Sequence, residues 1–106
     1  MMLNEYQEKS KRTIPEGLSV RESMLNAALG ICGEAGECAD AIKKWQYQGH
    51  PYPNKNIIEE LGDVMFYVAM MATSAGVSLE DVASKNIGKL KARYPDKFDP
   101  ERSINR

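Results

Sequence analysis

Two pairs of acidic residues stand where a helix would set them among apolar neighbours. Glu34 and Glu37 lie within GICGEAGECADA, and Glu60 and Asp63 lie within IIEELGDVMFYV. At about 100° per residue, positions three apart are separated by about 60° around a helix, so each pair lies on or beside the apolar stripe. Carboxylates that face a core are costly to bury unpaired, so we expect a positive partner to compensate them.

A hard divalent cation is the positive partner that best suits these carboxylates. Neither helix carries a basic residue within one turn of its acids on that stripe, whereas Mg²⁺ and Mn²⁺ prefer carboxylate and water oxygens. A di-iron bundle would use Glu-x-x-His pairs, and the one histidine, His50, stands in a proline-rich loop. Neighbouring glycines leave room for ions or a ligand: Gly30, Gly33, Gly36 and Gly62. The alternative is that both pairs line the solvated edge of an amphipathic helix.

A basic helix face later in the chain offers the other half of such a site. In KNIGKLKARYP, the residues Asn86, Lys89 and Arg93 recur at steps of three and four. An amide, an ammonium and a guanidinium on one side of a helix suit a phosphate chain that metal ions also hold. The same residues could instead form a solvated basic face near a helix C-terminus.

Helices are the elements that must position these groups, because no stretch alternates with a period of two. We predict a short helix over residues 2–12 and three longer ones: the first over 20–46, the second from about 55 or 57 to 74, and the third over 79–94. The motifs SVRE and SLED resemble capping boxes, and Asn54 or Asn56 is the expected cap of the third helix. An irregular tail is expected over about 96–106. The predicted fold is all-α: one domain, residues 1–106, forming an antiparallel four-helix bundle with a short extra N-terminal helix.

Composition excludes several classes of protein. The net charge of −1, from 14 basic and 15 acidic residues, lacks the basic footprint of a nucleic-acid binder. No secretory signal or membrane-spanning stretch is evident, so we expect no membrane and no nucleic-acid polymer among the partners. Cys32 and Cys38 are expected to be small core residues in a reducing compartment. A cytoplasmic location follows as the expectation.

The order of the two acidic motifs resembles the MazG-like nucleotide pyrophosphohydrolases of the all-α NTP pyrophosphatase superfamily. Members of that family carry EExxE and then ExxD on two helices of a bundle, and here GEAGE precedes EELGD. The similarity extends through KNIGKLKARYP and covers about residues 20–95. One departure is Gly33, which stands where the longer motif has the first of two adjacent glutamates.

The resemblance implies a reaction and a set of site residues. The reaction is hydrolysis of a ribo- or deoxyribonucleoside triphosphate to the monophosphate and pyrophosphate, by attack of water on the α-phosphorus. Magnesium is the implied cofactor, with manganese as a substitute, and Glu37 is favoured over Glu34 to orient or deprotonate the water. The implied metal ligands are Glu34, Glu37, Glu60 and Asp63. The implied phosphate-binding residues are Lys89, Arg93 and Asn86.

Trp45 and a few polar residues are the candidates for base recognition, and the apolar helix faces bear on assembly. Trp45 could stack on a base, or anchor the core or a subunit interface, and Asn26, Tyr6 and Gln7 are further candidates to close a pocket. Wide apolar faces predict a homodimer or homotetramer, in which a neighbour could complete each pocket. The competing function is a non-catalytic helical module that keeps the fold but binds a partner or regulates it.

Overall fold

The computed structural model describes all 106 residues as helices joined by turns, without a strand. The all-α prediction is confirmed, and the four predicted helices begin and end within three residues of their predicted bounds. The elements are α1 (Leu3–Ser10), η1 (Lys11–Thr13), α2 (Val20–Tyr47), α3 (Asn54–Ser74), α4 (Leu79–Arg93) and α5 (Pro100–Ile104).

Side-chain caps explain where two of these helices begin. Ser19 and Glu22 form the predicted capping box of α2, with the Glu22 N–H donating to the Ser19 hydroxyl at 3.1 Å and the Ser19 N–H donating to the Glu22 carboxylate at 3.0 Å. In α4, Ser78 accepts from the Asp81 N–H at 3.1 Å, but the Asp81 side chain makes no return bond. The predicted cap of α3 is wrong: Pro53 occupies the N-cap position and supplies no side-chain cap.

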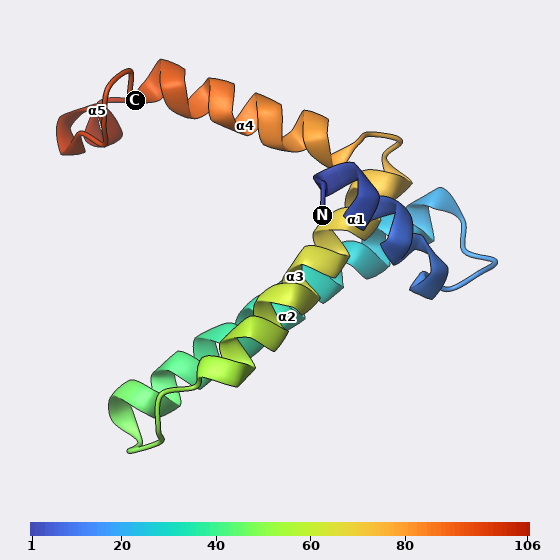
Figure 1. The fold of residues 1–106 in the computed structure, drawn as a ribbon, viewed down its shortest axis with the longest axis horizontal. Helices are drawn as coiled ribbons and strands as arrows, with labels where there is room; N and C mark the ends of the chain where they lie inside the picture. Colours follow the sequence, from blue (N-terminus) through green and yellow to red (C-terminus); the bar gives the residue numbers. More distant parts are fainter.

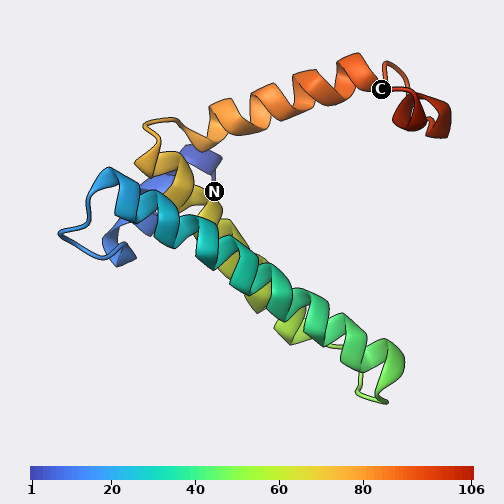
Figure 2. The same cartoon turned by 180° about the vertical axis from the view of Figure 1, so that it is seen from behind.

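The α2–α3 hairpin is the body of the molecule. The two helices run antiparallel and side by side along most of their length (Figures 1 and 2). Gly30 lies directly against the ring of Tyr67, and a Cβ at this position would overlap that ring. The absence of a side chain at Gly30 is therefore what permits the two helices to pack at this point.

Replacing Gly30 by Ala should destabilise the protein by about 1–3 kcal/mol, since the ring of Tyr67 must move to admit the methyl group. Urea unfolding of Gly30→Ala and Gly33→Ala measures this effect. Gly33 has nothing within 4 Å of its would-be Cβ, so its variant should be as stable as the wild type or more stable by up to about 1 kcal/mol. Equal losses in the two variants would contradict the close contact at Gly30.

Helix α4 does not join this hairpin within one chain. It leaves α3 at a bend of 102° and points away from α2 and α3 (Figures 1 and 2). Leu79, its first residue, is the single buried residue of α4. The antiparallel packing expected of the bundle is therefore limited, in one chain, to α2 and α3.

The C-terminal tail is more ordered than predicted. Residues 100–104 form α5, so the expectation of an irregular tail is wrong for this segment. Asp99 caps the helix by accepting from the Glu101 N–H at 3.0 Å, and Pro100 occupies the first turn, where its missing N–H costs nothing. Phe98 packs against Tyr94, with the two ring centroids 5.2 Å apart.

Few side chains of the single chain are buried. Six residues lie in the interior, namely Gln7, Ala27, Ala69, Met70, Ala72 and Leu79. Both cysteines are free, and Cys32 is exposed, which corrects the expectation that it is a core residue. No helix by itself is long and apolar enough to cross a membrane; α3 and α4 reach that length and composition only when taken together across their bend.

Candidate metal centre

Three carboxylates from the two hairpin helices converge on one point. Glu34 of α2 and Glu60 and Asp63 of α3 can each place an oxygen within 4.8 Å of the others. Glu34 and Glu60 are half-buried, and Asp63 is exposed. The antiparallel pairing of α2 and α3 creates this cluster by setting the two acidic motifs opposite each other.

Glu60 is the acid of the cluster whose pKa is shifted by the other acids. One of its carboxylate oxygens is buried and has no hydrogen-bond partner. Burial raises the pKa of Glu60, and a hydrogen bond to Glu34 and the negative charges of Glu34, Glu37 and Asp63 raise it further. The folded chain therefore holds a proton here more tightly than an exposed glutamate would.

The donor set fits a hard divalent cation. All three converging groups are carboxylates, without histidine or cysteine among them, and oxygen ligation is what Mg²⁺ and Mn²⁺ prefer. The buried oxygen of Glu60 that lacks a donor is the clearest single sign, because a cation would satisfy it. Glu34, Glu60 and Asp63 are the residues that would hold the ion.

The raised pKa of Glu60 predicts how the stability of the metal-free protein depends on pH. A carboxyl group whose pKa in the folded state lies above its ordinary 4.5 stabilises the fold while it is protonated. This contribution is present at low pH and is lost as the pH rises through the folded-state pKa. The variant Glu60→Gln has no carboxyl group at this position, so it does not lose this stability as the pH rises.

Thermal unfolding in the presence of a chelator, from about pH 4 to about pH 8, measures the effect. The unfolding midpoint of Glu60→Gln should rise relative to that of the wild type as the pH increases. Saturating Mg²⁺ should reduce the difference at the upper end of the range. A difference between the two midpoints that does not change with pH would contradict the assignment.

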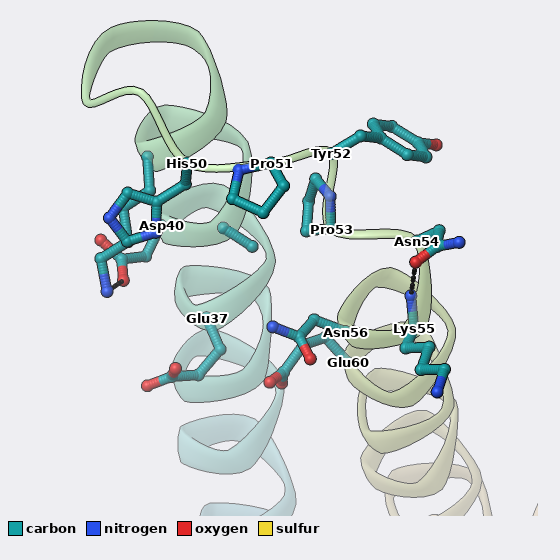
Figure 3. Close-up of a pocket in the computed structure, with 12 residues that line it drawn as sticks. Glu37, Asp40, His50, Pro51, Tyr52, Pro53, Asn54, Lys55, Asn56 and Glu60 are labelled. Carbon is teal, nitrogen blue, oxygen red and sulfur yellow. Dashed lines mark hydrogen bonds and ion pairs between the residues drawn. The ribbon is translucent and has the colours of Figure 1, made fainter.

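Glu37 lies one turn beyond Glu34 and outside the three-acid cluster. It is exposed, and with Glu60 it lines a cavity of about 360 Å³ below the loop that joins α2 and α3. Figure 3 shows Glu37 on α2 and Glu60 on α3 on the two sides of this cavity. The cavity is open and polar, so solvent and a charged ligand can reach the acids from this side.

The loop side of the cavity contains residues that sequence reasoning did not assign to the site. Asn56 places its amide beside Glu60 (Figure 3). Asn56 stands four residues before Glu60, a spacing that predicts both residues on one face of a helix. Lys44 lies on the α2 side and forms an ion pair with Asp40 at 2.8 Å. His50, which is expected to be a loop residue without a role in the site, also lines the cavity.

The basic face of α4 lies apart from the acids of the same chain. Lys89 and Arg93 belong to α4, the helix that bends away from the hairpin after α3 (Figure 1). Asn86 lines an apolar groove together with Leu3 of α1 and Val64 of α3. Within one chain the structure does not bring the three candidate phosphate-binding residues to the metal centre.

The candidate base-binding residues lie at different places in the fold. Trp45 packs edge-on against Tyr52 with ring centroids 5.1 Å apart and is 43% exposed, and Asn26 is half-buried on α2. Burial, and then the negative charge of Asp63, raise the pKa of Tyr6. Gln7 is buried at the turn between α3 and α4, and its amide is bonded there.

An antiparallel helix pair that sets two acidic motifs face to face defines an all-α protein with a candidate divalent-metal centre. Residues 22–98 match the family model described as the MazG nucleotide pyrophosphohydrolase domain. The chain therefore belongs to the MazG family, and the resemblance drawn from GEAGE and EELGD is confirmed.

Two relatives are similar to this chain over its central part. Gene 37 protein of Mycobacterium phage L5 is 37% identical over 76 residues, which cover 68% of this chain and 67% of the relative. The uncharacterized protein YvdC of Bacillus subtilis (strain 168) is 37% identical over 71 residues, covering 58% of this chain and 66% of the relative. The matches thus span about two thirds of each relative's length, and no solved structure matches the chain.

Proposed function

We propose that this protein is a Mg²⁺-dependent pyrophosphohydrolase that converts ribo- or deoxyribonucleoside triphosphates to monophosphates and pyrophosphate. Membership of the MazG family supports the reaction class. The observation that carries the proposal is the convergence of Glu34, Glu60 and Asp63 around a buried carboxylate oxygen without a partner. Manganese would substitute for magnesium, because the same oxygen ligands serve both ions.

The four acids would have two roles: binding the cation and accepting a proton from water. Glu34, Glu60 and Asp63 would hold the cation, with Glu37 reaching it from the cavity side. When bound, Mg²⁺ would neutralise charge on the triphosphate oxygens and make a nearby water more acidic. Glu37 would accept a proton from that water, since it is the acid that lies exposed on the open cavity.

The bond changes in this reaction balance without any further reactant. The water oxygen forms a bond to the α-phosphorus, and the bond from the α-phosphorus to the bridging oxygen breaks. Pyrophosphate leaves with that oxygen and the electron pair of the broken bond. Turnover in ¹⁸O-labelled water tests this proposal: the label should appear in the monophosphate, and label in pyrophosphate instead would contradict attack at the α-phosphorus.

The protein would act as a homodimer, or as a tetramer built from dimers. A folded monomer of 11.9 kDa is expected to expose about 6,000 Å², whereas this chain exposes 8050 Å². The excess of about 2,000 Å² exceeds the roughly 800 Å² that one partner buries in a standard interface. Exposed apolar side chains on α3 and α4 account for part of it: Ile58, Leu61, Met65, Val82, Ile87 and Leu90.

Dimerisation would also complete the site. Within one chain, the basic side chains of α4 do not reach the acids of the hairpin. Lys89 and Arg93 lie on α4, which bends away from the hairpin (Figure 1). A second copy of α4, packed against the apolar surface of the hairpin, would bring Asn86, Lys89 and Arg93 to these acids. The opposite charges of the two surfaces favour this pairing.

The remaining assignments complete the proposal. Trp45, Asn26 and Tyr6 would contact the nucleoside, which carries aromatic and hydrogen-bonding groups suited to these side chains. Residues 1–106 would form a single MazG-like domain. A cytoplasmic location is proposed because nucleoside triphosphates are found there and both cysteines are free.

A further inference from the structure

Gln7 is the one polar residue in the interior of the chain. Only 7% of it is exposed, and it belongs to α1, far in sequence from the residues that it contacts. Its amide nitrogen donates to the Val77 carbonyl at 2.9 Å and to the Thr73 hydroxyl at 3.2 Å, and its amide oxygen accepts from the Leu79 N–H at 2.8 Å. One side chain therefore bonds the end of α3, the following turn and the start of α4.

Asn4 makes a second set of bonds one helical turn earlier on α1. Its side-chain oxygen accepts from the Glu80 N–H at 3.1 Å, and its amide donates to the Glu80 carboxylate at 3.1 Å. The first N–H groups of a helix have no partner within the helix and must find one elsewhere. For α4, two of these partners come from α1, so hydrogen bonds from α1 fix the start of α4.

Within one chain, few other contacts determine the direction of α4. The turn before it contains Gly76 with a φ of 72°, and Leu79 is its single buried residue. The helix has 15 residues and is therefore about 22 Å long. A change of about 10° at the turn would displace Arg93, at its far end, by about 4 Å, more than the tolerance of a hydrogen bond.

We propose that Gln7 is a positioning residue for α4. It holds the α3–α4 turn at the angle that brings Lys89 and Arg93 to the acidic centre of a second copy. The inference rests on the proposed function, in which Lys89 and Arg93 of α4 bind the substrate phosphates. Gln7 touches neither substrate nor metal; it acts through the direction of α4. The metal ligands lie on α2 and α3, so the affinity for Mg²⁺ does not depend on Gln7.

The variant Gln7→Met tests the hydrogen bonds with little change in packing, because methionine keeps the length of the side chain without its donors and acceptor. Asn4→Ala removes the outer bonds at an exposed position, where folding is not at risk. Gln46→Met, at an exposed position near the far end of α2, is the control. All three variants are measured as full-length protein.

Spin labels report the angle of α4 directly. With Cys32 and Cys38 replaced by Ser, labels at Lys43→Cys and Lys91→Cys give the distance between α2 and α4, and dilution with unlabelled protein restricts it to one chain. Gln7→Met should broaden or shift this distance, Asn4→Ala should do so less, and Gln46→Met should leave it unchanged. An unchanged distance in Gln7→Met would overturn the inference.

Binding of an α,β-methylene nucleoside triphosphate provides the functional measurement without turnover. Gln7→Met should weaken this binding by about tenfold or more, the effect of losing charge-assisted phosphate contacts, while the Mg²⁺ affinity stays within about twofold of the wild type. Unchanged nucleotide binding despite a broadened distance would also overturn the inference. If the wild type hydrolyses no nucleotide but Gln7→Met still broadens the distance, the role of Gln7 in fixing the α3–α4 turn is supported and the proposed function is contradicted.

Discussion

The variant Glu60→Gln should lose nearly all activity and yet unfold at a higher temperature than the wild type when metal is absent. Activity should fall by about 10³-fold or more, because a proposed ligand of the cation is lost and stabilisation of charge by a metal is worth several kcal/mol in such reactions. The metal-free fold should gain stability, because a neutral amide replaces a half-buried carboxylate that faces three other acids and has one buried oxygen without a partner. Opposite changes in activity and stability are expected of a binding site and not of a structural residue.

Glu59→Gln is the matched control for this variant. Glu59 is the adjacent residue on α3, it is exposed, and its side chain is outside the three-acid cluster. Removing its charge should change activity and stability little. Loss of stability in metal-free Glu60→Gln, or retention of wild-type activity, would contradict the role assigned to Glu60.

Two inactive variants should restore activity to each other when they are mixed. Glu34→Gln disables the acidic centre, and the double variant Lys89→Ala with Arg93→Ala disables the basic face of α4. If each site takes its acids from one chain and its α4 from the other, a mixed dimer contains one wild-type site. Random exchange makes half of the dimers mixed, so activity should recover to about one quarter of the wild-type value.

Sites built within single chains give a different result. In that case every site in the mixture carries one of the two defects, and mixing restores nothing. Unfolding the two variants together and refolding them ensures exchange of subunits. A mixture of Glu34→Gln with Glu37→Gln is the control, because both changes fall on the acidic motif and a mixed dimer then has no intact site.

Much of the fold follows from patterns that depend on short stretches of sequence. The capping box at Ser19, the apolar spacing of α2 and α3 and the prolines between them predict the helical hairpin. The convergence of Glu34, Glu60 and Asp63 follows from the same periodicity, because antiparallel helices with acids on their facing stripes must bring them together. These features are set by residues a few positions apart.

The path of α4 depends on residues far apart in sequence and was not predictable in this way. Its apolar residues, such as Val82 and Leu90, show that it needs a partner surface but not which chain supplies it. Its direction depends on Gln7, whose sequence context does not reveal that it lies buried at the α3–α4 turn. The short helix α5 was missed for a related reason: it is too short for periodicity to reveal, and it is defined by the Asp99 cap.

Product analysis of wild-type protein with a panel of ribo- and deoxyribonucleoside triphosphates and Mg²⁺ is the direct test of the proposed reaction. The proposed function predicts that monophosphate and pyrophosphate form in equal amounts from at least one nucleotide, and that neither forms when Mg²⁺ is removed or when Glu37→Gln replaces the wild type. Diphosphate and inorganic phosphate as the products would contradict attack at the α-phosphorus. No product from any nucleotide, with Mg²⁺ bound, would contradict the enzymatic function and favour a non-catalytic helical module.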